Sequence, residues 1–93
     1  MIYTVKFTSR YKRDYKACIK RGWDISLLDS VVELLMQGKP LPARCYDHEL
    51  VGNWKGFREC HIRPDWLLLY YVDHDIVTLT LTQTGTHSDL FQK

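Results

Sequence analysis

The chain has 93 residues and a mass of 11.1 kDa, which is room for a single domain, since domains usually contain about 100–150 residues. Hydrophobic residues make up 45% of the chain and aromatic residues 13%, which excludes an intrinsically disordered protein. The net charge of +2 is too small to indicate nucleic-acid binding by itself.

The sequence shows no sign of a membrane segment or a signal peptide. Its longest apolar run, residues 66–72, is far shorter than the roughly 20 residues that a membrane-spanning helix needs. The first charged residues, Lys6 and Arg10, come before any apolar stretch of the kind found in signal peptides. We therefore expect a soluble, cytoplasmic protein with one domain over residues 1–93 and no membrane partner.

Basic residues are concentrated near the N-terminus. Seven of the 13 Lys and Arg residues lie in the first 21 positions, where Asp14 is the one acidic residue, whereas the other 72 residues contain six basic and ten acidic residues. The seven are Lys6, Arg10, Lys12, Arg13, Lys16, Lys20 and Arg21. Such a segment is typical of a surface that contacts a phosphate backbone, but it is equally typical of a solvated helix face.

The first half of the chain is predicted to be a strand followed by two helices. Residues 2–7 alternate between apolar and polar side chains, as a half-buried strand does. Thr8 or Ser9 can cap a helix that ends at Gly22, and Asp24 can cap a second helix that stops at residues 38–40. Each helix has one apolar face, made of Tyr11, Tyr15, Cys18 and Ile19 in the first and Leu28, Val31, Val32 and Leu35 in the second.

The second half is predicted to be a loop and three antiparallel strands. Residues 41–56 have loop-like composition. The expected strands are 57–62, 66–72 and 76–82, with turns at 63–65 and 73–75 and a short polar tail from residue 85. The middle strand is apolar on both sides, so we expect it to be central and buried. The order β-α-α-β-β-β predicts an α+β domain with its helical hairpin packed on an antiparallel-rich sheet.

The three cysteines, Cys18, Cys45 and Cys60, are an odd number without CxxC spacing. A small secreted domain usually carries an even set of disulfide-bonded cysteines. We therefore expect reduced, partly buried thiols and no cysteine nucleophile.

Several polar residues of the second half can meet at one end of the sheet. His61 ends one strand, Asp65 begins the next turn, and His87 follows the last strand, so neighbouring strands would bring these three to a common rim. Imidazoles and a carboxylate suit acid-base chemistry on a substrate that brings its own nucleophile, as RNA does with its 2′-hydroxyl. The alternatives are surface or sheet histidines without a chemical role. No spacing of a zinc motif is present, and we expect no metal and no cofactor.

At this point three segments show a family resemblance. They are DHxLxGxWKGFR at residues 47–58, HIRPDWLLLY at 61–70 and TGTHSDLF at 84–91. Together they resemble the YafQ branch of the RelE/ParE toxin superfamily, whose element order is also β-α-α-β-β-β. The resemblance implies a type II toxin that cleaves mRNA on the ribosome without metal. It also implies an antitoxin partner, usually one with a ribbon-helix-helix DNA-binding end.

The resemblance implies that the site residues are His48, His61, Asp65, Trp66, His87 and Phe91. Our hypothesis assigns roles to these residues and to several basic ones. His87 would be the general acid, and Asp65 with His61 or His48 would remove or relay the 2′ proton. The residues expected to bind RNA are Lys55, Arg58 and Arg63 on the phosphate, Trp66 and Phe91 on bases, and Lys12, Arg13 and Lys16 on ribosomal RNA. For Arg58 the alternative is a structural ion pair.

One position departs from the family's pattern. Gln83 stands immediately before Thr-Gly-Thr-His, where members typically carry Arg. An arginine would supply permanent positive charge for the transition-state phosphate, whereas glutamine offers only a neutral donor. The loss is either uncompensated, which we favour, or compensated by Arg63.

A second functional class stays open on the sequence alone. A non-catalytic toxin of the same fold would act by binding a protein target such as a topoisomerase. It would not need His48, His61, Asp65 and His87, so their presence favours the nuclease.

Overall fold

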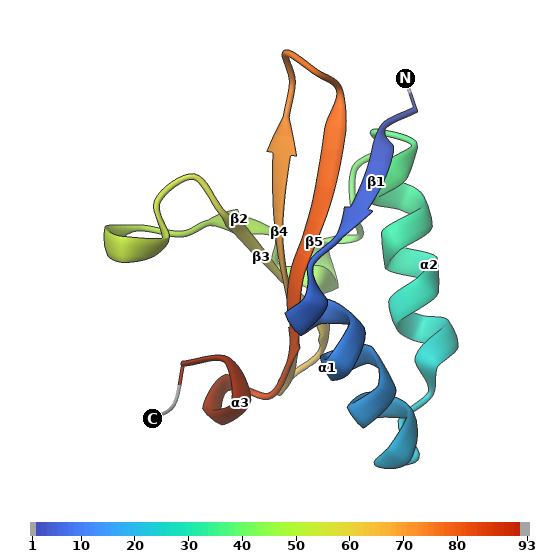
Figure 1. The fold of residues 1–93 in the computed structure, drawn as a ribbon. Coiled ribbons are helices and arrows are strands. Elements are labelled where there is room, and N and C mark those ends of the chain that lie inside the picture. The colour runs from blue at the N-terminus through green and yellow to red at the C-terminus, as the bar shows by residue number, and fades with distance from the viewer. Residues whose placement is uncertain (1, 92–93) are drawn as a thin grey trace.

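The computed structural model describes residues 2–91 and has a five-stranded sheet with helices on both faces (Figure 1). The elements are β1 (Thr4–Phe7), α1 (Ser9–Lys20), α2 (Ile25–Met36), η1 (Ala43–Cys45), β2 (His48–Glu49), η2 (Gly52–Trp54), β3 (Arg58–Arg63), β4 (Trp66–Asp73), β5 (Thr78–Gly85) and α3 (His87–Phe91). The strand order is β1-β5-β4-β3-β2, with β1 parallel to β5 and all other pairs antiparallel. The predicted α+β class and the antiparallel-rich sheet are confirmed.

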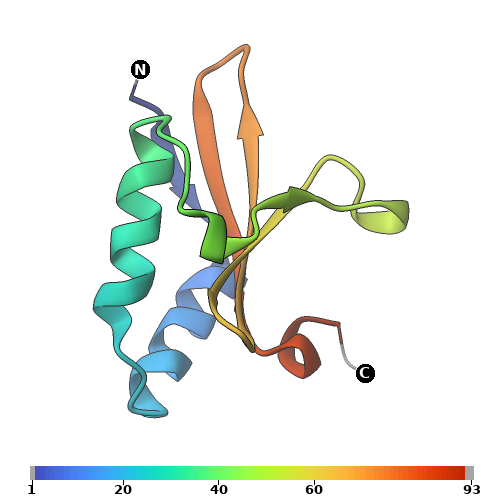
Figure 2. The same cartoon turned by 180° about the vertical axis from the view of Figure 1, so that it is seen from behind.

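Helices α1 and α2 begin and end at the predicted signals. Thr8 caps α1 by accepting a hydrogen bond from the backbone N–H of Tyr11 (2.9 Å), and Asp24 caps α2 by accepting one from Ser26 (3.1 Å). Gly22 and Gly38 follow the two helices with φ of 80° and 71°, a conformation that favours glycine. The hairpin of α1 and α2 lies on one face of the sheet, opposite α3 and the η2 loop (Figures 1 and 2).

Strand β4 is the centre of the fold, as predicted. All five residues from Trp66 to Tyr70 are buried, and their side chains alternate between the two faces. Leu68 and Tyr70 point to α1 and α2, in the larger core cluster, and we call this side the helix-covered face. Leu67 and Leu69 point the other way, where they pack with Leu90 of α3, and we call this side the open face.

The structure differs from the predicted elements in its second half. The last strand begins at Thr78 instead of residue 76, because the Asp73 side chain accepts hydrogen bonds from Asp75 N and Ile76 N and thus prolongs the turn. The expected loop 41–56 contains the short strand β2, which extends the sheet beyond β3. The last strand extends to Gly85 instead of residue 82, and residues 87–91 of the expected polar tail form α3.

The three cysteines are buried free thiols, as predicted. Burial raises the pKa of Cys18 to about 11, which keeps this thiol protonated and unreactive near neutral pH. Cys60 is fully buried in the cluster of the helix-covered face, whereas its neighbour His61 points to the open face.

Among the helices of residues 2–91, none has the length and apolar character of a membrane span.

Candidate active site

The open face of the sheet gathers most of the polar residues singled out in the sequence. Cα partners across antiparallel strands share a face, and the register places His48, Glu59, Leu69 and Gln83 in one row across β2, β3, β4 and β5. His61 lies in the next row, beside Leu67. Strand alternation therefore builds the floor of the candidate site, and α3 with the β3–β4 turn forms its end.

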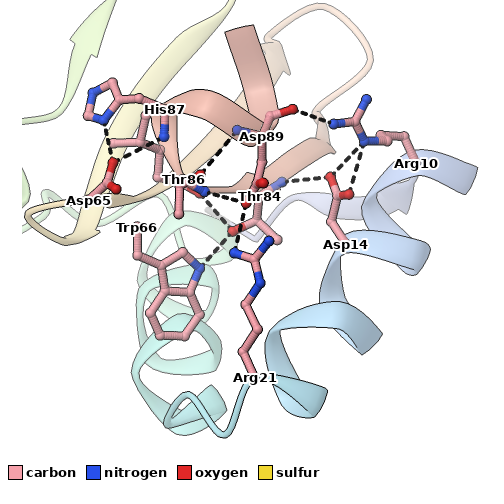
Figure 3. A network of polar contacts seen from close by, with 10 residues as sticks. Arg10, Asp14, Arg21, Asp65, Trp66, Thr84, Thr86, His87 and Asp89 are labelled. Carbon is pink, nitrogen blue, oxygen red and sulfur yellow. Dashed lines mark hydrogen bonds and ion pairs between the residues drawn. The ribbon is translucent and has the colours of Figure 1, made fainter. Parts of the chain in front are cut away.

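His87 and Asp65 form a close polar pair at the end of the sheet. His87 is the first residue of α3, and Asp65 lies in the turn between β3 and β4. Oδ1 of Asp65 accepts hydrogen bonds from the backbone N–H of His87 (3.1 Å) and from its ring Nδ1 (2.7 Å), as Figure 3 shows. These bonds lower the pKa of Asp65 below its ordinary value.

The same contact defines which ring atom of His87 is free. Because Asp65 is ionised and can only accept, Nδ1 carries the donated proton. Nε2 is then left to exchange a proton with a substrate, since half of the His87 side chain is exposed. The predicted meeting of His61, Asp65 and His87 at one rim is confirmed, because the rings of His61 and His87 lie 5.9 Å apart between centroids.

The two other histidines share one carboxylate. Nε2 of His48 and Nε2 of His61 lie 3.4 and 3.8 Å from the same Oε1 of Glu59. Nδ1 of each ring donates to a backbone carbonyl, that of Tyr46 (2.8 Å) for His48 and that of Pro64 (3.2 Å) for His61. Both rings thus present Nε2 to Glu59, and this shared carboxylate connects His48 to His61 at the rim.

Glu59 is the site residue that our sequence reasoning missed. It is only 6% exposed, which is unusual for a glutamate, and it lies between two imidazoles. The sequence did contain a signal, because Glu59 and His61 are two residues apart on an alternating strand and therefore share a face. The buried carboxylate gives this half of the site a negative centre.

The loop before β2 is anchored by a buried tyrosine. The hydroxyl of Tyr70 donates to Asp47, and Arg58 donates to the same carboxylate through Nε and Nη2 at 3.3 Å each. Burial, together with the Asp47 contact, raises the pKa of Tyr70 above its ordinary value. Asp47 therefore positions the neighbouring His48, and the alternative given for Arg58, a structural ion pair, is confirmed.

The expected stacking role of Trp66 is wrong for this structure. Trp66 is 2% exposed, its Nε1 donates to Oγ1 of Thr84 (3.0 Å), and its ring packs against Trp23 with centroids 4.8 Å apart. With its ring enclosed and its one donor used, Trp66 has no face left for a base. Its contribution is to hold β4 and β5 together beside Asp65.

An aromatic side chain near the site does remain accessible. Phe91, at the end of α3, is half-buried and meets Trp54 edge to face, with centroids 6.1 Å apart. Trp54 belongs to η2, and Lys55 follows it in an exposed position. Phe91, Trp54 and Lys55 thus form one side of the open face, where an RNA base and phosphate can be approached.

Gln83 and Arg63 differ in their surroundings. Gln83 is half-buried on the open face, and its Oε1 is the one buried side-chain acceptor in residues 2–91 without a hydrogen-bond partner. Arg63 is exposed at the end of β3, opposite Trp66, whose side chain lies in the core of the helix-covered face.

The predicted ribosome-docking residues lie apart from this rim. Lys12, Arg13 and Lys16 are exposed on α1, which packs against β5.

Within residues 2–91, no three His, Cys, Asp or Glu side chains are grouped closely enough to hold a metal ion.

Comparisons with known proteins place the chain among bacterial toxins. Residues 3–92 match the family model described as the YafQ bacterial toxin of type II toxin-antitoxin systems. The chain is 39% identical over 88 residues to the mRNA interferase toxin YafQ of Escherichia coli (strain K12), with 94% of each sequence covered.

Solved structures agree with this match. A chain of the E. coli DinJ-YafQ toxin-antitoxin complex is 37% identical, with a TM-score of 0.89 and coverage of 98% of this chain and 99% of that one. A metal-bound toxin from Helicobacter pylori is 41% identical, with a TM-score of 0.90 and coverage of 98% and 100%.

Proposed function

The chain belongs to the YafQ family of bacterial toxins from type II toxin-antitoxin systems, and we propose that it is an endoribonuclease that cleaves mRNA bound to the ribosome. The observation that carries the proposal is the His87–Asp65 pair, with its free Nε2 facing a rim that also holds His61. Such an arrangement supplies acid-base catalysis to RNA, whose own 2′-hydroxyl is the nucleophile.

The proposed reaction is an in-line transfer at phosphorus. The 2′-oxygen forms a bond to the adjacent phosphorus while the bond from phosphorus to the 5′-oxygen breaks, leaving a 2′,3′-cyclic phosphate and a free 5′-hydroxyl. His87 donates the proton on Nε2 to the departing 5′-oxygen. Asp65 holds Nδ1 and stabilises the charged imidazole. This orienting role replaces the proton relay that the sequence had suggested for Asp65.

The 2′ proton leaves on the opposite side of the rim. We assign its removal to Nε2 of His61 or of His48, because Glu59 lies within 4 Å of both and stabilises the imidazolium that forms. The 5.9 Å between the His61 and His87 rings suits an acid and a base that act on one phosphate. The mechanism needs no metal, because imidazoles carry both proton transfers.

Neutral and positive groups around the rim hold the substrate in this proposal. Lys55 is exposed and supplies a phosphate contact, whereas Arg58 is held by Asp47. Arg63 contacts the phosphate only in the alternative in which it replaces the charge missing at Gln83. Gln83 stands where an arginine would stabilise the transition state, and it provides one neutral donor. Phe91 stacks on a base of the mRNA.

Two macromolecular partners follow from the proposal. The basic face of α1 docks on ribosomal RNA, and charge reversal at Lys12, Arg13 and Lys16 weakens ribosome binding and flattens its salt dependence. An antitoxin with a ribbon-helix-helix DNA-binding end silences the toxin, in line with the DinJ complex of the E. coli relative. The toxin acts in the cytoplasm, where its substrate is.

The test is cleavage of mRNA on programmed ribosomes by His87→Ala and Asp65→Asn, with His74→Ala as the matched control, since His74 lies in the β4–β5 turn. We expect His87→Ala to lower the single-turnover rate by about 10²-fold or more, and His74→Ala to cut at the wild-type rate. A wild-type protein that leaves ribosome-bound mRNA intact yet inhibits a topoisomerase would establish the binding toxin instead.

A further inference from the structure

The position of His87 depends on a helix that cannot hold itself in place. Helix α3 has five residues, far fewer than the 12–15 that an isolated helix needs to be even marginally stable in water. Its placement therefore rests on its contacts with the rest of the chain. Leu90 and Phe91 pack on the open face. Apart from the bonds of His87 to Asp65, the side chains that bond to α3 from other elements come from α1 and its C-cap, on the opposite side of β5.

Arg10 of α1 and Arg21, the residue that follows α1 as its C-cap, reach α3 at the same residue. Nη1 of Arg21 lies 2.7 Å from Oδ2 of Asp89, and Nη2 of Arg10 donates to the backbone carbonyl of Asp89 (2.9 Å). Figure 3 shows both arginines approaching the β5–α3 junction from α1. The Arg21 contact lowers the pKa of Asp89 to about 2.

Asp89 also fixes the start of α3. Its Oδ2 accepts a hydrogen bond from the backbone N–H of Thr86 (2.9 Å), and Oγ1 of Thr86 accepts one from the backbone N–H of Asp89 (3.1 Å). This reciprocal pair is a capping box, and it sets the direction in which His87 leaves the strand. Gly85 permits the approach, because a Cβ at this position would lie 2.9 Å from Oδ2 of Asp89.

The arginine side chains are themselves held. The guanidinium of Arg21 lies over the ring of Trp23 at 4.8 Å, and that ring packs on Trp66. Arg10 bonds to Asp14 at 2.9 and 3.1 Å, and Oδ2 of Asp14 accepts from the backbone N–H of Thr84 (3.1 Å). The network thus joins α1 to the last residues of β5 as well as to α3.

We propose that Arg21 and Asp89 are positioning residues, whose ion pair holds the start of α3 so that His87 meets Asp65. For its catalytic meaning the inference rests on the proposed function. Without the ion pair, α3 keeps its apolar contacts but loses its fixed direction, so the bond from Nδ1 of His87 to Asp65 is made for a smaller fraction of the time.

The pKa of the Asp65 carboxyl measures how often the bond from Nδ1 of His87 is made, because that bond ends on this carboxyl. Its pKa is lowered by the hydrogen bonds from His87, while the nearby charge of Asp89 raises it. Removal of that charge in Asp89→Asn would by itself lower the Asp65 pKa, so a rise in this variant can come only from the loss of the His87 contact. We would follow the titration of the Asp65 carboxyl by carbon-13 NMR in the wild type, Arg21→Met, Arg21→Lys and Asp89→Asn. Lys39→Met is the matched control, since it removes one exposed positive charge after α2, at a distance from α3.

We expect Arg21→Met and Asp89→Asn to raise the pKa of Asp65 toward its ordinary value, whereas Arg21→Lys and Lys39→Met leave it low. In single-turnover cleavage on ribosomes, Arg21→Met should be slower by about 10- to 100-fold at saturating ribosome concentration, with unchanged ribosome affinity. The double variant Arg21→Met/Asp89→Asn should be no slower than either single variant, because both remove the same ion pair.

An Asp65 pKa that stays low in Arg21→Met, or one that rises while cleavage keeps its full rate, would overturn the inference. If the wild-type protein does not cleave ribosome-bound mRNA, the proposed function fails, and the titration of Asp65 still decides whether Arg21 and Asp89 position His87.

Discussion

On the helix-covered face of the sheet, Leu68 and Tyr70 lie in a continuous apolar cluster with buried residues of α1 and α2. On the open face, Glu59 and His61 occupy the neighbouring positions of β3, and the apolar cluster is small, with Leu67, Leu69 and Leu90 as its buried members. The two faces come from the same three strands, and alternation alone separates them.

The helix-covered face therefore contributes most of the stability, and the open face contributes the groups that can do chemistry. Burial of aliphatic and aromatic side chains dominates the free energy of folding, so the helix-covered face should determine the unfolding transition. The open face bears a buried glutamate beside two histidines, which a stability argument alone would disfavour. Substitutions on the two faces should therefore separate unfolding from cleavage.

The largest effect should follow from Leu68→Ala on the helix-covered face. Leu68 is fully buried, so its truncation leaves a cavity and should lower the free energy of unfolding by about 2–5 kcal/mol. Urea denaturation followed by circular dichroism measures it. A loss below about 1 kcal/mol would mean that this face does not determine stability.

Gln83→Arg on the open face should change the rate instead. If the charge missing at this position is uncompensated, cleavage should become faster by about 10²–10³-fold, which corresponds to about 2.7–4 kcal/mol of transition-state stabilisation. Arg63→Ala should then have little effect, because Arg63 lies at the strand end opposite a core residue. The reverse pattern, in which Arg63→Ala nearly abolishes cleavage and Gln83→Arg leaves the rate unchanged, would show that Arg63 supplies the missing positive charge.

Glu59→Gln tests whether the buried carboxylate serves the site. Gln preserves the shape but removes the charge that faces His48 and His61, and losing a charged partner of this kind costs about 1.5–3 kcal/mol. We expect single-turnover cleavage to slow by about 10- to 100-fold while the unfolding midpoint changes little. Full cleavage by Glu59→Gln would assign Glu59 to packing.

The smallest effect concerns Asp89 and is a dependence on pH. Its pKa is about 2 in the folded protein against an ordinary value of 3.8, so the folded state favours the ionised form. The resulting stability is fully present above about pH 4 and disappears as the pH falls toward 2. Because Asp89 is partly exposed, we expect Asp89→Asn to cost about 1 kcal/mol or less at pH 7. Denaturation at both pH values checks this, and an equal cost at pH 2 would contradict it.

The fold could be predicted from the sequence where local signals agree with tertiary packing. Thr8 and Asp24 cap helices as expected, and the apolar run at 66–72 became the central strand. Helix α3 was not predicted because it has only five residues, although the Thr86-x-x-Asp89 capping box in the sequence indicates where it begins. The turn before β5 was too short in the prediction, because the contacts of the Asp73 side chain are visible only in three dimensions.

The site was predictable to a different degree. Strand ends brought His61, Asp65 and His87 together as the order of elements indicated, but Glu59 was overlooked because a charged residue on a strand usually faces solvent. Trp66 was assigned to RNA because it follows Asp65 in the motif, and the structure buries its ring. A motif thus identifies residues that occur together, while burial decides which of them can touch a substrate.

The central claim is that His87 protonates the leaving 5′-oxygen, and one substrate tests it most directly. An mRNA with sulfur in place of the 5′-oxygen at the cleavage site has a leaving group that departs as a thiolate and needs no general acid. On programmed ribosomes, His87→Ala should cut this substrate at nearly the wild-type rate, although it cuts the ordinary mRNA about 10²-fold more slowly. An equal deficit on both substrates would contradict the assignment of His87 as the general acid.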